Sequence, residues 1–92
     1  MGRETVLFRT EEKMSRNEAA ELLRAIAEKI ENGRVVLQQG TEEVKLKIPD
    51  RVELEVKAEK EVGRRRTKKK LELEIEWLVG ASANKQKALT LG

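Results

Sequence analysis

The sequence predicts an α+β fold of two layers, in which one amphipathic helix packs on a mainly antiparallel sheet in the order β-α-β-β-β-β. Three observations predict it. One segment has its apolar residues at helical spacing behind a helix cap, and three later segments alternate apolar and charged residues. The chain has 92 residues, which is enough for one small domain. Since each element has a single apolar face, we expect the helix and the sheet to cover one another.

The first two elements are a strand and a helix. Residues 4–9 contain β-branched and aromatic types and predict a short strand. Ser15 and Glu18 have the spacing of a capping box, in which each side chain accepts a hydrogen bond from the other residue's backbone amide. The helix that starts there ends before Gly33, which stands at the position of a left-handed cap. Its apolar stripe consists of Ala19, Leu22, Leu23, Ile26, Ala27 and Ile30.

The rest of the chain predicts a four-strand meander. Residues 34–38 are rich in β-branched types and lead into a hairpin turn at Gly40. Three further segments alternate apolar and charged residues with a period of two, which is typical of strands with one buried face. Turns are predicted at Pro49-Asp50 and within residues 62–66. The alternating apolar residues are Val44, Leu46 and Ile48, then Val52, Leu54, Val56 and Ala58, and finally Leu71, Leu73, Ile75 and Trp77.

The pattern predicts one domain over residues 4–78 and a disordered C-terminal tail over residues 79–92. The last residues of the chain lose all amphipathic periodicity, which is typical of a free terminus. Leu89 and Leu91 could dock on a partner or extend an edge strand, but two leucines are weak evidence for either role.

Composition excludes most familiar active sites. The chain has no Cys, His or Tyr, so thiolate and imidazole metal sites, cysteine nucleophiles and histidine acid–base chemistry are absent. The longest apolar runs are three residues, against roughly 20 for a membrane span, so we expect a soluble, cytoplasmic protein. Sixteen of the seventeen acidic residues are Glu, and the chain also has 20 Lys and Arg residues. A composition rich in Glu, Lys and Arg resembles that of proteins adapted to high temperature.

Several of these features together resemble the amphi-Trp domain family, which is named for an amphipathic strand that ends in Trp. The resemblance covers residues 4–78, and its distinctive parts are the capped helix and the last alternating strand. The family has no established activity, so the resemblance implies a fold and not a function. The matching segments are 6–9, 14–23, 31–33, Pro49 and 71–77.

A basic segment lies at a predicted hairpin tip and holds six cations in seven residues. It is not a feature that we associate with the family. Such a loop could lie along phosphates and bind nucleic acid weakly and without sequence specificity. The alternative is a solvated hairpin end whose lysines discourage edge pairing. Trp77 and Phe8 are the only aromatic residues, and both are expected in the core, so platforms for base stacking are missing. The candidate phosphate contacts in the loop 64–70 are Arg64, Arg65, Arg66, Lys68, Lys69 and Lys70.

Glutamates are expected on the polar face of the same hairpin. They could gather around Ca²⁺ or Mg²⁺, form an ordinary solvated face, or meet the basic loop of a second copy in a C2 dimer. Pairing Val56 with Leu73 would create two favourable and two unfavourable cross-strand pairs. These are Lys57 with Glu72, Glu59 with Lys70, Glu55 with Glu74, and Glu53 with Glu76.

Trp77 has two interpretations. Because it is in phase with the apolar residues of the last strand, we expect it to close the core beneath the helix. The alternative is an exposed anchor for a partner, since Trp is enriched at binding hot spots.

These observations favour a small non-enzymatic binding or interaction module that holds no cofactor and no metal. We expect a protein partner or self-association, with nucleic acid as the alternative ligand, and neither a membrane nor a small-molecule substrate. A catalytic Lys–Glu or paired-Glu site would need a pKa perturbed by burial, which exposed strand glutamates do not provide.

Overall fold

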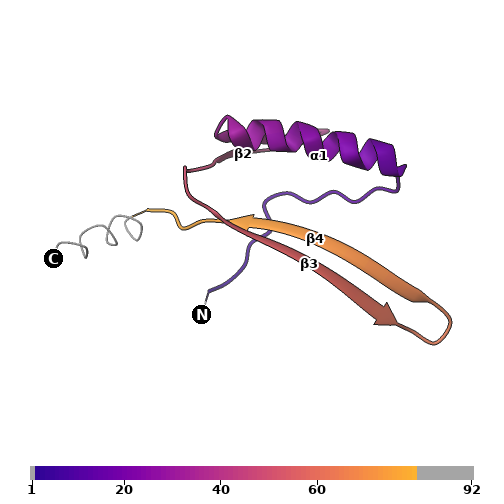
Figure 1. Ribbon diagram of the computed structural model, residues 1–92. Coiled ribbons are helices and arrows are strands. Elements are labelled where there is room, and N and C mark those ends of the chain that lie inside the picture. Colours follow the sequence, from indigo (N-terminus) through magenta and orange to yellow (C-terminus); the bar gives the residue numbers. More distant parts are fainter. Residues whose placement is uncertain (1, 81–92) are drawn as a thin grey trace. The chain divides into compact units, whose positions relative to one another are not determined.

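The computed structural model describes residues 2–80, which contain one helix followed by four strands (Figure 1). The chain divides after Asp50 into two units, the first with the helix and two strands and the second with the other two strands. This arrangement confirms the α+β class. The elements are α1 (Arg16–Glu31), β1 (Arg34–Gln39), β2 (Glu42–Lys47), β3 (Glu53–Val62) and β4 (Thr67–Glu76).

The strand predicted at residues 4–9 is absent from the described part of the chain, so the observed order is α-β-β-β-β and the initial strand of the prediction is wrong. Val6 and Leu7 are 74% and 66% exposed, and Phe8 is half-buried. β-branched and aromatic residues favour a strand only where a neighbouring strand packs against their side chains. Neither of the two sheets in residues 2–80 includes this segment, since β1 pairs only with β2 and β3 pairs only with β4.

The helix α1 begins and ends where its caps predict. The backbone amide of Glu18 donates to Ser15 Oγ and the amide of Ser15 donates to Glu18 Oε1, each at 3.0 Å. The capping box is therefore confirmed. At the other end Gly33 has φ 84° and its amide donates to the carbonyl oxygen of Ile30 at 2.9 Å. A residue with a Cβ would be strained at this φ, so the sequence needs glycine here.

Strands β1 and β2 form an antiparallel hairpin with a turn at Gly40, which has φ 62°. The register pairs Val35 with Leu46 and Leu37 with Val44, so these four side chains share one face. Val35 is 5% exposed and the other three are half-buried.

The helix α1 contacts β1, and the core of the first unit lies there. Ile26 and Ile30 on the predicted apolar stripe are half-buried. Leu22 and Leu23 on the same stripe are each 51% exposed. The helix therefore covers the hairpin with only part of its apolar stripe.

Strands β3 and β4 run side by side as an antiparallel hairpin (Figure 1). Val56 pairs with Leu73, which confirms the predicted register. The turn is residues 63–66, and the amide of Gly63 donates to the carbonyl oxygen of Arg66 at 2.8 Å. A Cβ on Gly63 would lie 3.1 Å from that oxygen, so this close approach favours glycine.

The predicted single meander is two separate two-stranded sheets, because β2 does not pair with β3. The amide of Ile48 donates to Gly33 O at 2.9 Å and extends the first hairpin by one bond. Pro49 follows with no amide hydrogen to donate. Residues 48–52 thus connect the sheets without closing a tight hairpin.

No helix in the described residues is long and apolar enough to span a membrane. The predicted tail at 79–92 falls outside the described residues from position 81 onward.

Candidate functional site

The candidate site is the β3–β4 hairpin, whose two faces have different chemistry. Successive residues of a strand point to opposite faces, so each cross-strand pair belongs to one face. On the polar face every residue is charged, and all four pairs expected from the sequence are present. From the open end to the turn, these pairs are Glu53–Glu76, Glu55–Glu74, Lys57–Glu72, Glu59–Lys70 and Glu61–Lys68.

Four side chains in the middle of the polar face form a closed ring of ion pairs. Lys57 Nζ lies 3.6 Å from Glu59 and 3.7 Å from Glu72, and Lys70 Nζ lies 3.5 Å from Glu59 and 3.7 Å from Glu72. The pKa of Lys57 is raised above its ordinary value, chiefly by the charge of Glu59, then by Glu72 and Glu55. All four ring side chains are 45–51% exposed, so solvent weakens each pair.

Like charges meet at the open end of the polar face. Glu55 is opposite Glu74, and Glu53 is opposite Glu76. The nearby charge of Glu76 raises the pKa of Glu74 above its ordinary value, and a hydrogen bond and charge repulsion from Glu55 raise it further. The hairpin therefore has an excess of negative charge at its open end that its own cations do not neutralise.

The basic segment is divided by the structure. Arg64, Arg65 and Arg66 lie in the turn, whereas the three lysines that follow belong to β4, so the prediction that 64–70 is one loop is wrong. The prediction fails because Thr67, Lys68, Lys69 and Lys70 pair with β3, and alternation within β4 then sends Lys69 to the opposite face from Lys68 and Lys70. Lys69 pairs there with Lys60.

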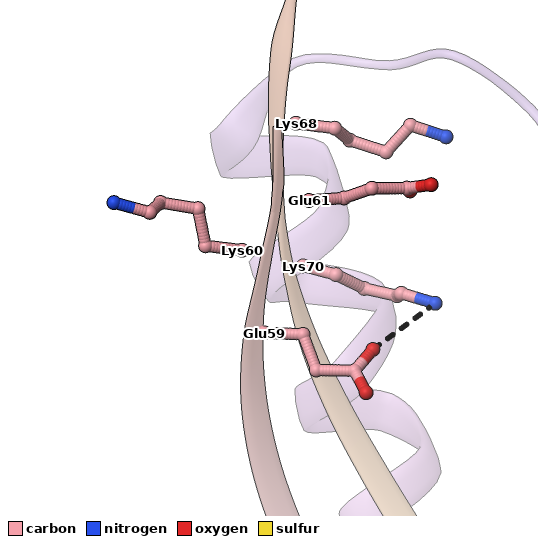
Figure 2. A pocket seen from close by; sticks show the side chains of 5 residues that line it. All are labelled: Glu59, Lys60, Glu61, Lys68 and Lys70. Carbon is pink, nitrogen blue, oxygen red and sulfur yellow. Dashed lines mark ion pairs between the residues drawn. The ribbon is translucent and has the colours of Figure 1, made fainter. Parts of the chain in front are cut away.

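Figure 2 shows the two faces of the hairpin near its tip. Glu59, Glu61, Lys68 and Lys70 point to one side and Lys60 points to the other, and all five residues line a hollow. Lys70 is held by Glu59 and Glu72 and is a poor candidate for a phosphate contact. Among the described residues, the other five predicted basic residues and Lys60 form no ion pair.

Lys60 is the residue that the sequence reasoning missed. The signal was present, because extending the predicted register by one pair beyond Glu59–Lys70 places Lys60 opposite Lys69. The basic cluster of the hairpin tip is therefore Lys60, Arg64, Arg65, Arg66, Lys68 and Lys69.

The second face of the hairpin is apolar and open. Its pairs are Leu54 with Ile75, Val56 with Leu73, and Ala58 with Leu71. Leu54 and Val56 are each 60% exposed, Leu71 is 70% exposed and Leu73 is 52% exposed. We name these six side chains the apolar face. Trp77 follows β4 and is half-buried, which fits neither a closed core nor a free anchor fully.

The glutamates of the polar face do not form a metal site in the described part of the chain. No group of three or more Asp or Glu residues there is arranged to hold a metal ion. The carboxylates at the open end lie instead in two cross-strand pairs, Glu53 with Glu76 and Glu55 with Glu74, along two extended strands.

Comparison with known proteins identifies the family. A family model described as the Amphi-Trp domain matches residues 1–92, which is the whole chain and more than the 4–78 of the resemblance noted above. Searches of curated proteins and of solved structures find no match. The chain belongs to the amphi-Trp domain family.

Proposed function

We propose that this protein is a small non-enzymatic interaction module that binds a protein partner through its β3–β4 hairpin. The observation that carries the proposal is the apolar face, whose leucine and valine side chains are 52–70% exposed. A two-stranded hairpin is marginally stable alone and gains stability when its apolar face is covered. Contiguous exposed apolar surface of this kind marks interaction sites.

The charges around the apolar face indicate the chemistry of the partner. Lys60 and Lys69 are paired on the same face, directly beyond Ala58 and Leu71. The arginines of the turn follow immediately. A partner segment that covers the leucines therefore meets cations at the tip. We propose a partner with an apolar stripe that is flanked by carboxylates at one end.

The test is a quantitative pull-down from an extract of the protein's own cells, with the full chain as bait. Leu71→Gln/Leu73→Gln removes apolar surface from β4 without opening a buried core. Leu22→Gln/Leu23→Gln is the matched control, because it removes two leucines of 51% exposure from α1. We expect partners retained by the wild type and the control to be lost with the β4 variant. Equal retention by all three baits would contradict the proposal.

The second candidate function is weak, non-sequence-specific binding of nucleic acid by the hairpin tip. The observation that favours it is that Lys60, Lys69 and the three arginines of the turn have no ion-pair partner among the described residues. Cations free of carboxylates can release counterions from phosphates. Fluorescence anisotropy of labelled DNA and RNA tests it, with Lys60→Gln/Lys69→Gln compared against Lys57→Gln/Lys70→Gln. Only the first variant should lose salt-sensitive binding.

The proposal is non-enzymatic because the carboxylates lie on an exposed face. The pKa of Glu74 is raised chiefly by its charged neighbours, whereas catalytic carboxylates are usually shifted by burial in a cleft. The proposal includes neither a cofactor nor a small-molecule substrate. It places the module in the cytoplasm because of the short apolar runs in the sequence. In this proposal, α1 packed on the hairpin of β1 and β2 serves as the scaffold, in agreement with the burial of Val35.

A further inference from the structure

The charges along β4 are sorted by sign. On the polar face, Lys68 and Lys70 occupy the half next to the turn, and Arg66 is the last residue of the turn, two positions before Lys68. The other half of the strand carries three carboxylates on the same face, Glu72, Glu74 and Glu76. An antiparallel pair of such strands brings the positive half of each opposite the negative half of the other.

One edge of β4 is available for such pairing. β4 forms its ladder with β3 on one side, and no strand in residues 2–80 pairs with its other side. β4 has ten residues, and every second one turns its backbone N–H and C=O toward that edge.

We propose that β4 pairs antiparallel with β4 of a second copy, with Leu71 opposite Leu71 on a twofold axis. The result is a four-stranded sheet in the order β3-β4-β4-β3. In this register Lys70 faces Glu72 and Lys68 faces Glu74 of the second copy. Arg66, the last residue of the turn, comes opposite Glu76 where the new ladder continues one residue beyond β4. Twofold symmetry repeats each pair, so all six charged pairs along the new ladder are of opposite sign.

The charge pattern selects this register among its neighbours. Two neighbouring registers also keep the charged residues of both copies on the polar face. One of these registers places Glu72 opposite Glu72, and the other places Lys70 opposite Lys70. Like charges directly opposite each other disfavour pairing.

The charge pattern also selects β4 over β3. The polar positions of β3 are Glu53, Glu55, Lys57, Glu59 and Glu61, four carboxylates and one ammonium group. Antiparallel pairing of β3 with itself therefore places glutamates opposite glutamates. The second edge of the hairpin repels its own copy.

The pairing also relieves the repulsion within each hairpin. Glu55 and Glu74 face each other at the open end, where the pKa of Glu74 is raised. In the dimer, Lys68 of the second copy lies beside Glu74 on the side away from Glu55. Arg66 of the second copy lies in the same way beside Glu76, which is opposite Glu53. Each unfavourable pair thus gains a cation that its own chain does not supply.

This inference goes beyond the proposed function because it assigns the edge of β4 and not the apolar face. The two surfaces are linked, since both hairpins turn their leucines to the same side of the new sheet. In the proposed register the two apolar faces adjoin at Leu71 on the twofold axis, and Leu73 of each copy lies opposite Lys69 of the other.

Charge complementation between two variants of the full chain tests the dimer. Glu74→Lys/Glu76→Lys makes two of the three negative positions of β4 positive, and it improves the hairpin itself by placing lysines opposite Glu55 and Glu53. Arg66→Glu/Lys68→Glu makes part of the positive half negative. Each variant alone turns four of the six pairs between copies into like-charge pairs, whereas a mixed dimer restores all six.

We expect sedimentation velocity to show a wild-type dimer that weakens as salt rises. Each variant alone should dimerise more weakly by a factor on the order of tenfold to a hundredfold. An equimolar mixture of the two should recover a dimer. Circular dichroism on each variant checks that it is folded.

Several results would overturn the inference. These are a monomeric wild type at both low and high salt, larger open-ended assemblies, or a mixture that does not associate. If the acidic variant fails to fold, the Glu74→Lys/Glu76→Lys variant still decides the matter. If this variant is folded and dimerises as tightly as the wild type, the proposed pairing through the edge of β4 in this register is excluded. A failed pull-down would leave the dimer standing, so the two proposals fail separately.

Discussion

Val35 and Val36 offer a direct test of where the core of the first unit lies. They are the same residue type at adjacent positions of β1, so replacement by Ala changes their β-propensity alike. Val35 is 5% exposed on the face shared with Leu46, whereas Val36 is 38% exposed on the opposite face. The difference between the two Ala variants therefore isolates burial.

The expected magnitudes follow from the exposures. Val35→Ala removes two methyl groups from a buried site, at about 0.8 kcal/mol each, and leaves a small cavity, for a total of about 2 kcal/mol. Val36→Ala loses less buried area and its site is open to water, so about 1 kcal/mol is expected. The difference is about 1 kcal/mol, or roughly 1 M in the midpoint of urea unfolding for a small protein.

Urea titration followed by circular dichroism at the helix band measures this difference, because α1 lies in the same unit as both valines. Equal midpoints for the two variants, or a larger loss for Val36→Ala, would refute the assignment of the core to the contact between α1 and β1.

Three further outcomes are expected. Ser15→Ala should lower the free energy of unfolding by about 1 kcal/mol in the same titration, since it removes one half of the capping box; no change would contradict its role. Because the pKa of Glu74 is raised in the folded hairpin, the hairpin gains stability as pH falls through that pKa and the carboxylate is protonated. Because the pKa of Lys57 is raised from 10.5, the hairpin loses stability as pH rises above 10.5 and the ammonium group loses its proton. NMR titration of both side chains checks the directions, and a Glu74 midpoint below 4.5 would contradict the first. The Glu-rich composition predicts thermal unfolding above the mesophile range of about 45–65 °C by calorimetry, and a midpoint within it would count against adaptation to heat.

Local signals in the sequence predicted local structure well. The capping box at Ser15 and the glycine at position 33 are settled by neighbouring residues within one helix end. The register of β3 and β4 followed from alternation and charge, because a slip by one residue would exchange the polar and apolar faces.

Long-range pairing was not predictable in the same way. The segment 4–9 has strand composition, but only a neighbouring strand could have made it one. Val52 and Leu54 continue the alternation after Pro49, yet no alternation pattern states which strand lies beside which. The predicted single sheet was therefore wrong, because the structure has β1 paired with β2 and β3 paired with β4 in two separate sheets.

The candidate site was predictable in charge and not in arrangement. Counting cations found the basic segment, but the alternation of β4 separates Lys69 from Lys68 and joins it to Lys60. The alternating leucines were expected in a core, whereas Leu71 and Leu73 are 70% and 52% exposed. Exposure depends on what covers a face, and a one-dimensional pattern does not contain that information.

The central claim is that the apolar face of the hairpin binds a partner, and a dissociation constant tests it most directly. The partner recovered by the wild type would be titrated by calorimetry with the wild type, with Leu71→Gln/Leu73→Gln and with Leu22→Gln/Leu23→Gln. Leu71 and Leu73 are 70% and 52% exposed, so covering them contributes about 1–2 kcal/mol each. The account predicts that the β4 variant binds roughly 30-fold to 1,000-fold more weakly while the α1 variant binds like the wild type. Equal dissociation constants for the wild type and the β4 variant would contradict it.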